Sequence, residues 1–245
     1  KEVLEDLILR CESINKLTNS IPTFCFERAF EFIKKNKLSD AKPLYGLPIP
    51  IKDSILVSKV KSTYGSLAFK NFVPKESDHV VIKIEKSGGV IFGKTNTPEF
   101  EAGASTFNDV FGVTRNPWNL KKSVSGSSGG AASAVASGMA FISQGSDFAC
   151  SIRYPSSFCG VVGLRHTPGL VPFGPTNNPY QTLSVNGPIA RNVDDLGLGL
   201  DSMTGLNIFD PLTTPRNKSN FKKASEEPFK KTEIAFSYDL SLGPI

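Results

Sequence analysis

A helical period that stops at two glycines and is followed at once by a β-rich run restricts the fold of this chain more than any other feature. Apolar residues recur at helical spacing over residues 80–84, after a Ser-Asp pair that can cap a helix. Gly88 and Gly89 end the period, and the apolar run of residues 90–92 follows. A helix, a glycine stop and a strand in this order predict an α/β fold with an alternating sheet.

The same alternation recurs along the chain, without an internal repeat. We expect a helix to open at Ser151, and further helices over residues 2–18, 26–35, 131–138 and 193–204. We expect strands over residues 49–57, 90–92, 140–144, 161–164 and 233–237. Residues 206–231 are rich in Pro, Asn and Lys, and this composition predicts a long loop.

Composition fits one globular domain or two. The 245 residues are 39% hydrophobic and 21% charged, which provides a sizeable core and excludes collagen, low-complexity disorder and coiled coil. No apolar run approaches the roughly 20 residues that cross a bilayer. Residues 1–10 form a charged amphipathic segment rather than a signal peptide. We therefore expect a cytoplasmic protein without a membrane partner.

Charge and cysteine content indicate neither a nucleic-acid site nor a metal site. Lys and Arg number 28 against 23 Asp and Glu, and much of the +5 excess lies at residues 121–122 and 218–231, where solvated loops are favoured. The four cysteines have neither the CxxC spacing of a metal site nor the density of a disulfide scaffold. We interpret them as reduced thiols.

Three separated polar clusters carry the functional argument, and the first contains Lys52. This lysine follows the apolar and ring-constrained residues 46–51. Burial at such a place lowers the pKa of a lysine, which makes a neutral amine, and hence a base, accessible near neutral pH. Taken alone, the pattern favours a structural lysine that reaches solvent.

The other two clusters place serines and glycines before helices. Residues 125–130, Ser-Gly-Ser-Ser-Gly-Gly, are compatible with an N-cap, a phosphate cradle or a proton relay through two serines. The Gly-Lys-Ser/Thr of a Walker motif does not follow, so nucleotide binding is not favoured. Residues 145–153 form a polar turn in which Ser151 would have backbone N–H groups beside its oxygen, the geometry that an oxyanion hole requires.

Together, these clusters resemble the amidase signature family of serine hydrolases. The resemblance covers essentially the whole chain, and Ser127 and Ser151 lie 24 residues apart, as in the family. It extends to motifs at residues 93–96, 116–118, 158–165 and 187–191. It implies a three-layer α/β/α sandwich around a mixed β-sheet. Residues 1–245 would be the N-terminal and catalytic-core portion of the family domain, which is expected to be truncated in its C-terminal half.

The resemblance also implies a Ser-Ser-Lys mechanism without histidine, cofactor or metal. Ser151 matches the nucleophile, Ser127 the bridging serine on a cis peptide bond, and Lys52 the general base. A neutral lysine would accept a proton through the bridging serine while the nucleophile attacks the amide carbonyl.

The remaining matched positions surround the nucleophile. The resemblance implies an oxyanion hole formed by the backbone N–H groups of Ser151 and of Phe148, Ala149 and Cys150. Ser128 matches a position that helps to orient the lysine. Asp147 and Arg153 match positions that brace the loop.

Several positions depart from the family pattern. Ala149 and Cys150 stand where two glycines are common, and a side chain at a position that needs positive φ costs about 1–2 kcal/mol. We interpret Cys150 as an inert neighbour rather than a substitute nucleophile. Ser125 stands where glycine is frequent, and His166 replaces a common proline. His79 is the other histidine. We expect both histidines at the surface, which argues against a Ser-His-Asp triad.

Three functions follow from the resemblance. The leading one is an amide hydrolase for a small carboxamide or an aryl or acyl amide, with a homodimer left open. An alternative is the glutaminase component of glutamyl-tRNA amidotransferase, which releases ammonia from glutamine for a partner protein and would bring a nucleic-acid partner. Residues 167–172 and 181–188 look more like general amidases. The third is an inactive or truncated non-catalytic member, which the Ala149-Cys150 pair and the expected truncation motivate.

Overall fold

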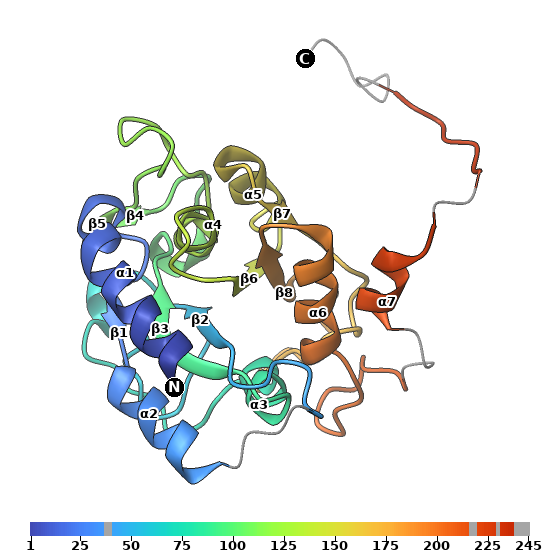
Figure 1. Ribbon diagram of the computed structural model, residues 1–245, viewed down its shortest axis with the longest axis horizontal. Helices are drawn as coiled ribbons and strands as arrows, with labels where there is room; N and C mark the ends of the chain where they lie inside the picture. Colours follow the sequence, from blue (N-terminus) through green and yellow to red (C-terminus); the bar gives the residue numbers. More distant parts are fainter. Residues whose placement is uncertain (37–40, 216–219, 229–230, 238–245) are drawn as a thin grey trace.

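The computed structural model describes residues 1–36, 41–215, 220–228 and 231–237, which adopt an α/β fold (Figure 1). One sheet has the order β1-β3-β2, from strands Thr23–Phe24, Val90–Thr95 and Pro48–Lys52. A second has the order β6-β8-β7, from Ile142–Asp147, Val185–Ala190 and Val162–Gly163. Strands β4 (Phe107–Asn108) and β5 (Gly112–Val113) form a short antiparallel pair.

The two larger sheets meet where β2 lies beside β6. The Lys52 amide N–H donates to Gln144 Oε1 at 3.1 Å, and the Ser143 hydroxyl donates to the Pro50 carbonyl at 3.2 Å. These contacts pair successive residues of the two strands in the same direction. The last residues of β2 and β6 therefore lie at one common edge.

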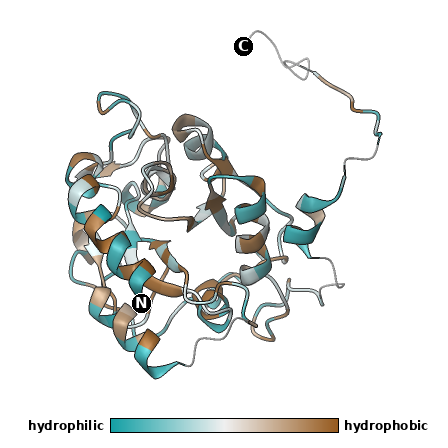
Figure 2. Ribbon diagram, viewed as in Figure 1, coloured by the Kyte–Doolittle hydropathy of each residue, from teal (hydrophilic) through white to brown (hydrophobic). Residues whose placement is uncertain are grey.

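Helices cover both faces of these sheets. Helices α3 (His79–Lys86) and α6 (Val193–Met203) share a core cluster with Ile49, Ile51 and Ile91. Val90 and Phe92, which alternate with Ile91 along β3, pack on the other face against α1 (Glu2–Thr18) and α2 (Phe26–Lys35). Figure 2 shows the matching separation of apolar and polar residues around α1.

Helices α4 (Gly129–Ala136) and α5 (Arg153–Cys159) pack around Ile189 of β8 in a third cluster. Short 3-10 turns η1 (Leu67–Phe69) and η2 (Glu99–Glu101) and helix α7 (Phe221–Glu226) complete the described elements. No helix in the described ranges is both long enough and apolar enough for a bilayer span.

The structure corrects several expected elements. The strand expected over 49–57 ends at Lys52, where turns begin, and the strand expected over 233–237 is wrong because those residues are irregular. The long loop expected over 206–231 contains α7. Strand β8 is absent from the sequence-based expectations because Pro188 lies inside it. Pro188 is tolerated because β7 pairs with β8 only at positions 189 and 190, so Pro188 lies beyond that pairing.

Helix α4 begins against the end of β3, and its first turn leaves no room for side chains. A Cβ atom on Gly130 would lie 2.3 Å from the Asn96 nitrogen and 2.6 Å from the Asn96 oxygen. The Gly130 N–H donates to that same oxygen at 3.3 Å. The glycine is therefore required by the close approach of two backbones.

We predict that Gly130→Ala lowers the free energy of unfolding by about 1–3 kcal/mol, because the forced separation of α4 and β3 outweighs the better helix propensity of alanine. Urea unfolding measures the change. Ala136→Gly at the half-exposed end of the same helix is the control and should cost about 1 kcal/mol from propensity alone. A stabilised Gly130→Ala protein would contradict this account.

Candidate active site

Lys52 ends β2 and is completely buried, so the interpretation as a lysine that reaches solvent is wrong. Its Nζ atom donates to Ser127 Oγ at 2.6 Å and to Ser146 Oγ at 2.8 Å. The Glu101 carboxylate oxygen Oε1 lies 3.2 Å from the same nitrogen. The lysine nitrogen therefore faces two hydroxyls and one carboxylate.

Two opposing influences set the pKa of Lys52. Burial lowers it, because the charged form loses its hydration. The carboxylates of Glu101 and then Asp147 raise it. The result is a pKa below the ordinary value of a lysine, so the neutral amine is more accessible than in water.

Ser127 follows a cis peptide bond from Gly126, as the family resemblance implies. Ser125 has a positive φ of 61° at the position where the family frequently has glycine. Gly126 lies against the backbone of residues 103–105, and a Cβ atom there would meet the Gly103 oxygen at 2.9 Å. The loop is thus held by close backbone packing, and it presents the Ser127 hydroxyl to Lys52.

Ser151 lies in the turn between β6 and α5, beside the Ser127-Ser128 segment. The Ser128 amide N–H donates to the Ser151 carbonyl oxygen at 3.1 Å, which joins the two serine-bearing loops. Ser151 is half-buried, and its hydroxyl has no hydrogen-bond partner among the described residues. The structure therefore brings together the backbones that carry the two serines and leaves the Ser151 hydroxyl unpaired.

The Ser128 hydroxyl does not contact the lysine. It donates to the Ser146 carbonyl oxygen at 3.1 Å and accepts from the Ser146 amide N–H at 3.2 Å. Ser146 in turn accepts from Lys52 through its own hydroxyl. Any influence of Ser128 on the lysine passes through Ser146, which the sequence patterns do not single out.

Glu101 is a further site residue that the sequence patterns miss. Its Oε1 atom accepts hydrogen bonds from the hydroxyls of Ser54 and Ser146 and forms the ion pair with Lys52. Phe100 and Glu101 have positive φ values of 49° and 61°, and this local turn directs the carboxylate to the lysine. The local sequence carries no signal for it, because a Glu next to Phe in a loop matches no catalytic pattern.

Asp147 organises the loop that carries Ser151. This fully buried carboxylate accepts from the amide N–H groups of Cys150, Ile152 and Arg153. The Arg153 guanidinium binds both of its oxygens at 3.0 Å, and Arg165 adds another cation. Burial opposes ionisation, but the Arg153 side chain and the backbone donors prevail and lower the pKa of Asp147 to about 2.

Among the four amides assigned to an oxyanion hole, one already has a partner. The Cys150 N–H donates to Asp147 Oδ1 at 2.9 Å, whereas those of Phe148, Ala149 and Ser151 meet no acceptor in the described part of the chain. Cys150 has a positive φ of 73°, so one of the two positions where glycine was expected does need the left-handed region. Ala149 does not.

A second buried lysine, Lys94, lies nearby at the end of β3. Its Nζ atom donates to Ser62 Oγ at 2.5 Å and to the Asp53 carbonyl oxygen at 3.1 Å. Burial lowers its pKa to about 8, although the carboxylates of Asp53 and Asp78 oppose this shift. Because its partners do not include either motif serine, Lys94 supports the fold next to the site and is not the lysine of the serine network.

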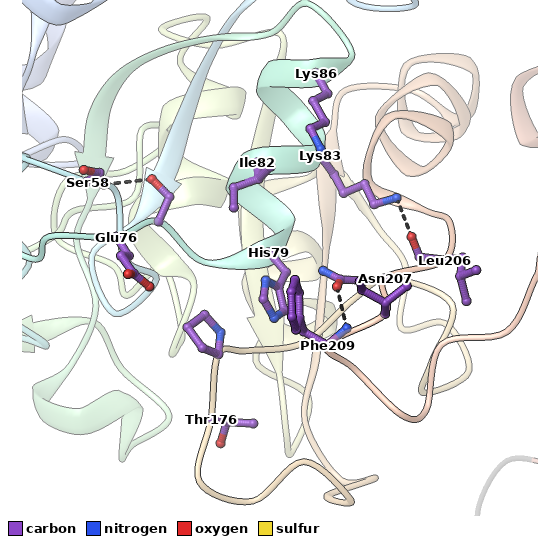
Figure 3. A pocket seen from close by; sticks show the side chains of 13 residues that line it. Ser58, Glu76, His79, Ile82, Lys83, Lys86, Thr176, Leu206, Asn207 and Phe209 are labelled. Carbon is purple, nitrogen blue, oxygen red and sulfur yellow. Dashed lines mark hydrogen bonds between the residues drawn. The ribbon is translucent and has the colours of Figure 1, made fainter.

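The expectation of surface histidines is wrong for His166. This residue is buried, with Nε2 2.6 Å from the Asn186 carbonyl oxygen and Nδ1 2.8 Å from that of Thr167. His79 is half-buried, and its ring stacks on Phe209 at 6.3 Å between centroids (Figure 3). Within the described residues, neither histidine side chain hydrogen-bonds to the lysine or to the two serines of the network.

A cavity of about 350 Å³ adjoins the lysine, and its lining includes Glu101, Ser146, Asp78 and Asn186. A larger cavity of about 910 Å³ lies around His79, with a different lining that includes no residue of the serine-lysine network (Figure 3). Across the described ranges, His, Cys, Asp and Glu do not gather in groups of three that could hold a metal ion. The four cysteines are unbridged.

Comparison with known proteins places this geometry in a family. The sequence model of the family described as Amidase matches residues 2–244. The acylamidase of Rhodococcus erythropolis is 36% identical over 249 residues, covering 100% of this chain and 52% of that protein. A glutamyl-tRNA(Gln) amidotransferase chain of Sulfurihydrogenibium sp. is 37% identical over 238 residues, covering 95% of this chain and 49% of that protein.

A solved structure extends the likeness to the fold. The structure of 6-aminohexanoate cyclic dimer hydrolase complexed with substrate superposes with a TM-score of 0.85 at 31% identity, over 93% of this chain and 48% of that chain. The chain thus spans about half the length of the relatives that it matches. With a family match over nearly all of its residues, the chain belongs to the amidase signature family.

Proposed function

We propose that this chain is the catalytic-core portion of an amide hydrolase, which cleaves carboxamide C–N bonds through an acyl-enzyme on Ser151. The observation that carries the proposal is the 2.6 Å contact between the buried Lys52 nitrogen and Ser127 Oγ. Residues 1–245 would form the N-terminal part of one three-layer α/β/α domain. The helices on both sheet faces support that layering.

Proton transfer would begin at Lys52. Its burial favours the neutral amine, which accepts the Ser127 hydroxyl proton as Ser127 takes the proton of Ser151. Ser151 Oγ then forms a bond to the amide carbonyl carbon, and the carbonyl π electrons move to oxygen. The proton returns through Ser127 to the leaving nitrogen as the C–N bond breaks, and water hydrolyses the ester that remains on Ser151.

The unpaired amides of Phe148, Ala149 and Ser151 would stabilise the negative oxygen of the tetrahedral intermediate. Such donors act strongly because they are oriented before the reaction, and the loss of one typically costs about 3 kcal/mol. Asp147 fixes this loop through the Cys150 amide, so we assign Cys150 a structural part in the hole rather than a free donor. Small amides are the proposed substrates.

A glutaminase function within an amidotransferase is the second candidate. The 37% identity to a glutamyl-tRNA(Gln) amidotransferase chain favours it as strongly as overall likeness favours the acylamidase. We prefer the hydrolase because of residues 167–172 and 181–188. Ammonia release from glutamine that depends on a partner protein would reverse this preference.

A non-catalytic member is the third candidate. The left-handed Cys150 and the half-length match motivate it. Covalent labelling separates this candidate from both catalytic ones, because only an activated serine reacts.

We predict that a fluorophosphonate labels Ser151 and that Ser151→Ala abolishes the label. Lys52→Met, which keeps the side-chain volume but removes the base, should slow labelling by about 10²–10⁴-fold. Mass spectrometry of the labelled peptide measures both effects. Cys150→Ser is the matched control and should retain the label. A folded protein that does not react would support the non-catalytic candidate.

We predict that Glu101→Gln shifts the rise of kcat/KM with pH to lower pH. The Glu101 charge raises the pKa of Lys52, so its removal increases the fraction of neutral lysine at a given pH. Glutamine can still accept from Ser54 and Ser146. Hydrolysis of a simple amide across a pH series tests this, with Glu99→Gln, an exposed carboxylate on the same turn, as control. An unchanged profile would rule out the coupling.

A further inference from the structure

The cavity of about 350 Å³ beside the lysine contains an unpaired donor on a buried side chain. Asn186 is 1% exposed and lies directly across from Ser146 in the register of β8 and β6. Its Oδ1 atom accepts from Gln144 Nε2 at 3.2 Å, which fixes the amide orientation. Its Nδ2 atom meets no acceptor in the described residues. A buried amide N–H group of this kind is satisfied only by a ligand or by water.

The same cavity holds unpaired acceptors on two carboxylates. Glu101 uses Oε1 for all of its hydrogen bonds, and its Oε2 atom has none among the described residues. Asp78 accepts from the Leu56 N–H at 3.1 Å through Oδ2, and its Oδ1 atom has none. No Lys, Arg or His is among the described residues that line the cavity.

We propose that this cavity binds an aminoacyl part of the amide substrate, with a protonated amine at Glu101 and Asp78 and a carbonyl oxygen at Asn186. This proposal rests on the proposed hydrolase function and names its substrate class. A ligand with one cationic donor and one neutral acceptor satisfies all three free groups of the lining.

Other ligand classes leave a charge or a polar group without a partner. A substrate carboxylate would face two carboxylates, and a plain alkyl chain would leave Asn186 Nδ2 buried and unpaired. The larger cavity of Figure 3 has the opposite character, because Lys83 and Lys86 line it. The chemistry of the smaller cavity is therefore specific to this location next to Lys52.

The test compares three small amides that differ in one feature at a time. Glycylglycinamide carries the ammonium group and the internal carbonyl, N-acetylglycinamide lacks only the ammonium, and 5-aminopentanamide replaces the internal amide by methylene groups. Calorimetric dissociation constants are measured at pH 7.5 with the Ser151→Ala chain, which cannot turn the ligands over. We expect glycylglycinamide to bind about tenfold more tightly than either analogue.

Variants assign each feature to its partner. The double variant Asp78→Asn/Glu101→Gln should bind glycylglycinamide and N-acetylglycinamide within about twofold of each other, because the charge-assisted bonds are lost. Asn186→Asp keeps the acceptor for Gln144 but removes the donor, and should erase the advantage over 5-aminopentanamide while the ammonium preference stays. Glu76→Gln, an exposed carboxylate near Asp78 in the sequence, is the control and should change neither ratio.

Equal binding of the three ligands, no binding of any, or a preference for the ammonium ligand that survives the double variant would overturn the proposal. Circular dichroism of each variant shows that it is folded before its constants are used. The outcome is separate from that of the proposed function. An ammonium preference in a protein whose Ser151 does not react would retain the binding site and reject the hydrolase, whereas a reactive serine without the preference would do the reverse.

Discussion

The hydrogen bond between Lys52 and Ser127 is the interaction on which the rest of the site depends. A fully buried lysine is costly because its ammonium group loses hydration, and the cost is reduced only where other groups face it. The fold supplies these groups from three places. Strand β6, beside β2, provides Ser146, the cis-linked loop provides Ser127, and the left-handed turn at η2 provides Glu101. The position of the lysine therefore requires the sheet edge and both loops at once.

Asp147 has the corresponding part on the nucleophile side. It follows Ser146 at the end of β6, so one strand end serves both halves of the site: Ser146 faces the lysine and Asp147 holds the loop of Ser151. Two arginines and three backbone amides fix its carboxylate. This bracing offers a physical reason why a cysteine is tolerated at a left-handed position, since the Cys150 amide bond to Asp147 offsets part of the cost of about 1–2 kcal/mol.

The sequence predicted the parts of this architecture that local patterns encode. The period over residues 80–84 and the glycine stop correspond to α3 and β3, and the serine clusters correspond to the loops before α4 and α5. It could not predict β8, where Pro188 indicates a strand breaker unless the extent of β7 is known. Nor could it predict Glu101 or the burial of His166, because both depend on contacts with segments distant along the chain. Pairing between distant segments leaves no local period in the sequence.

The hydrogen-bond inventory around Lys52 determines which neighbour exchanges a proton with it. As an ammonium, the lysine has three N–H groups for three neighbours: Ser127 Oγ, Ser146 Oγ and Glu101 Oε1. As a neutral amine it has two N–H groups and one lone pair. Glu101 offers only an acceptor, and the single Ser146 proton already points to Glu101. The two remaining N–H groups therefore serve these neighbours, and the lone pair is left to face Ser127. The carboxylate that raises the pKa of the lysine thus also directs its basicity along one path, from Ser127 and not from Ser146.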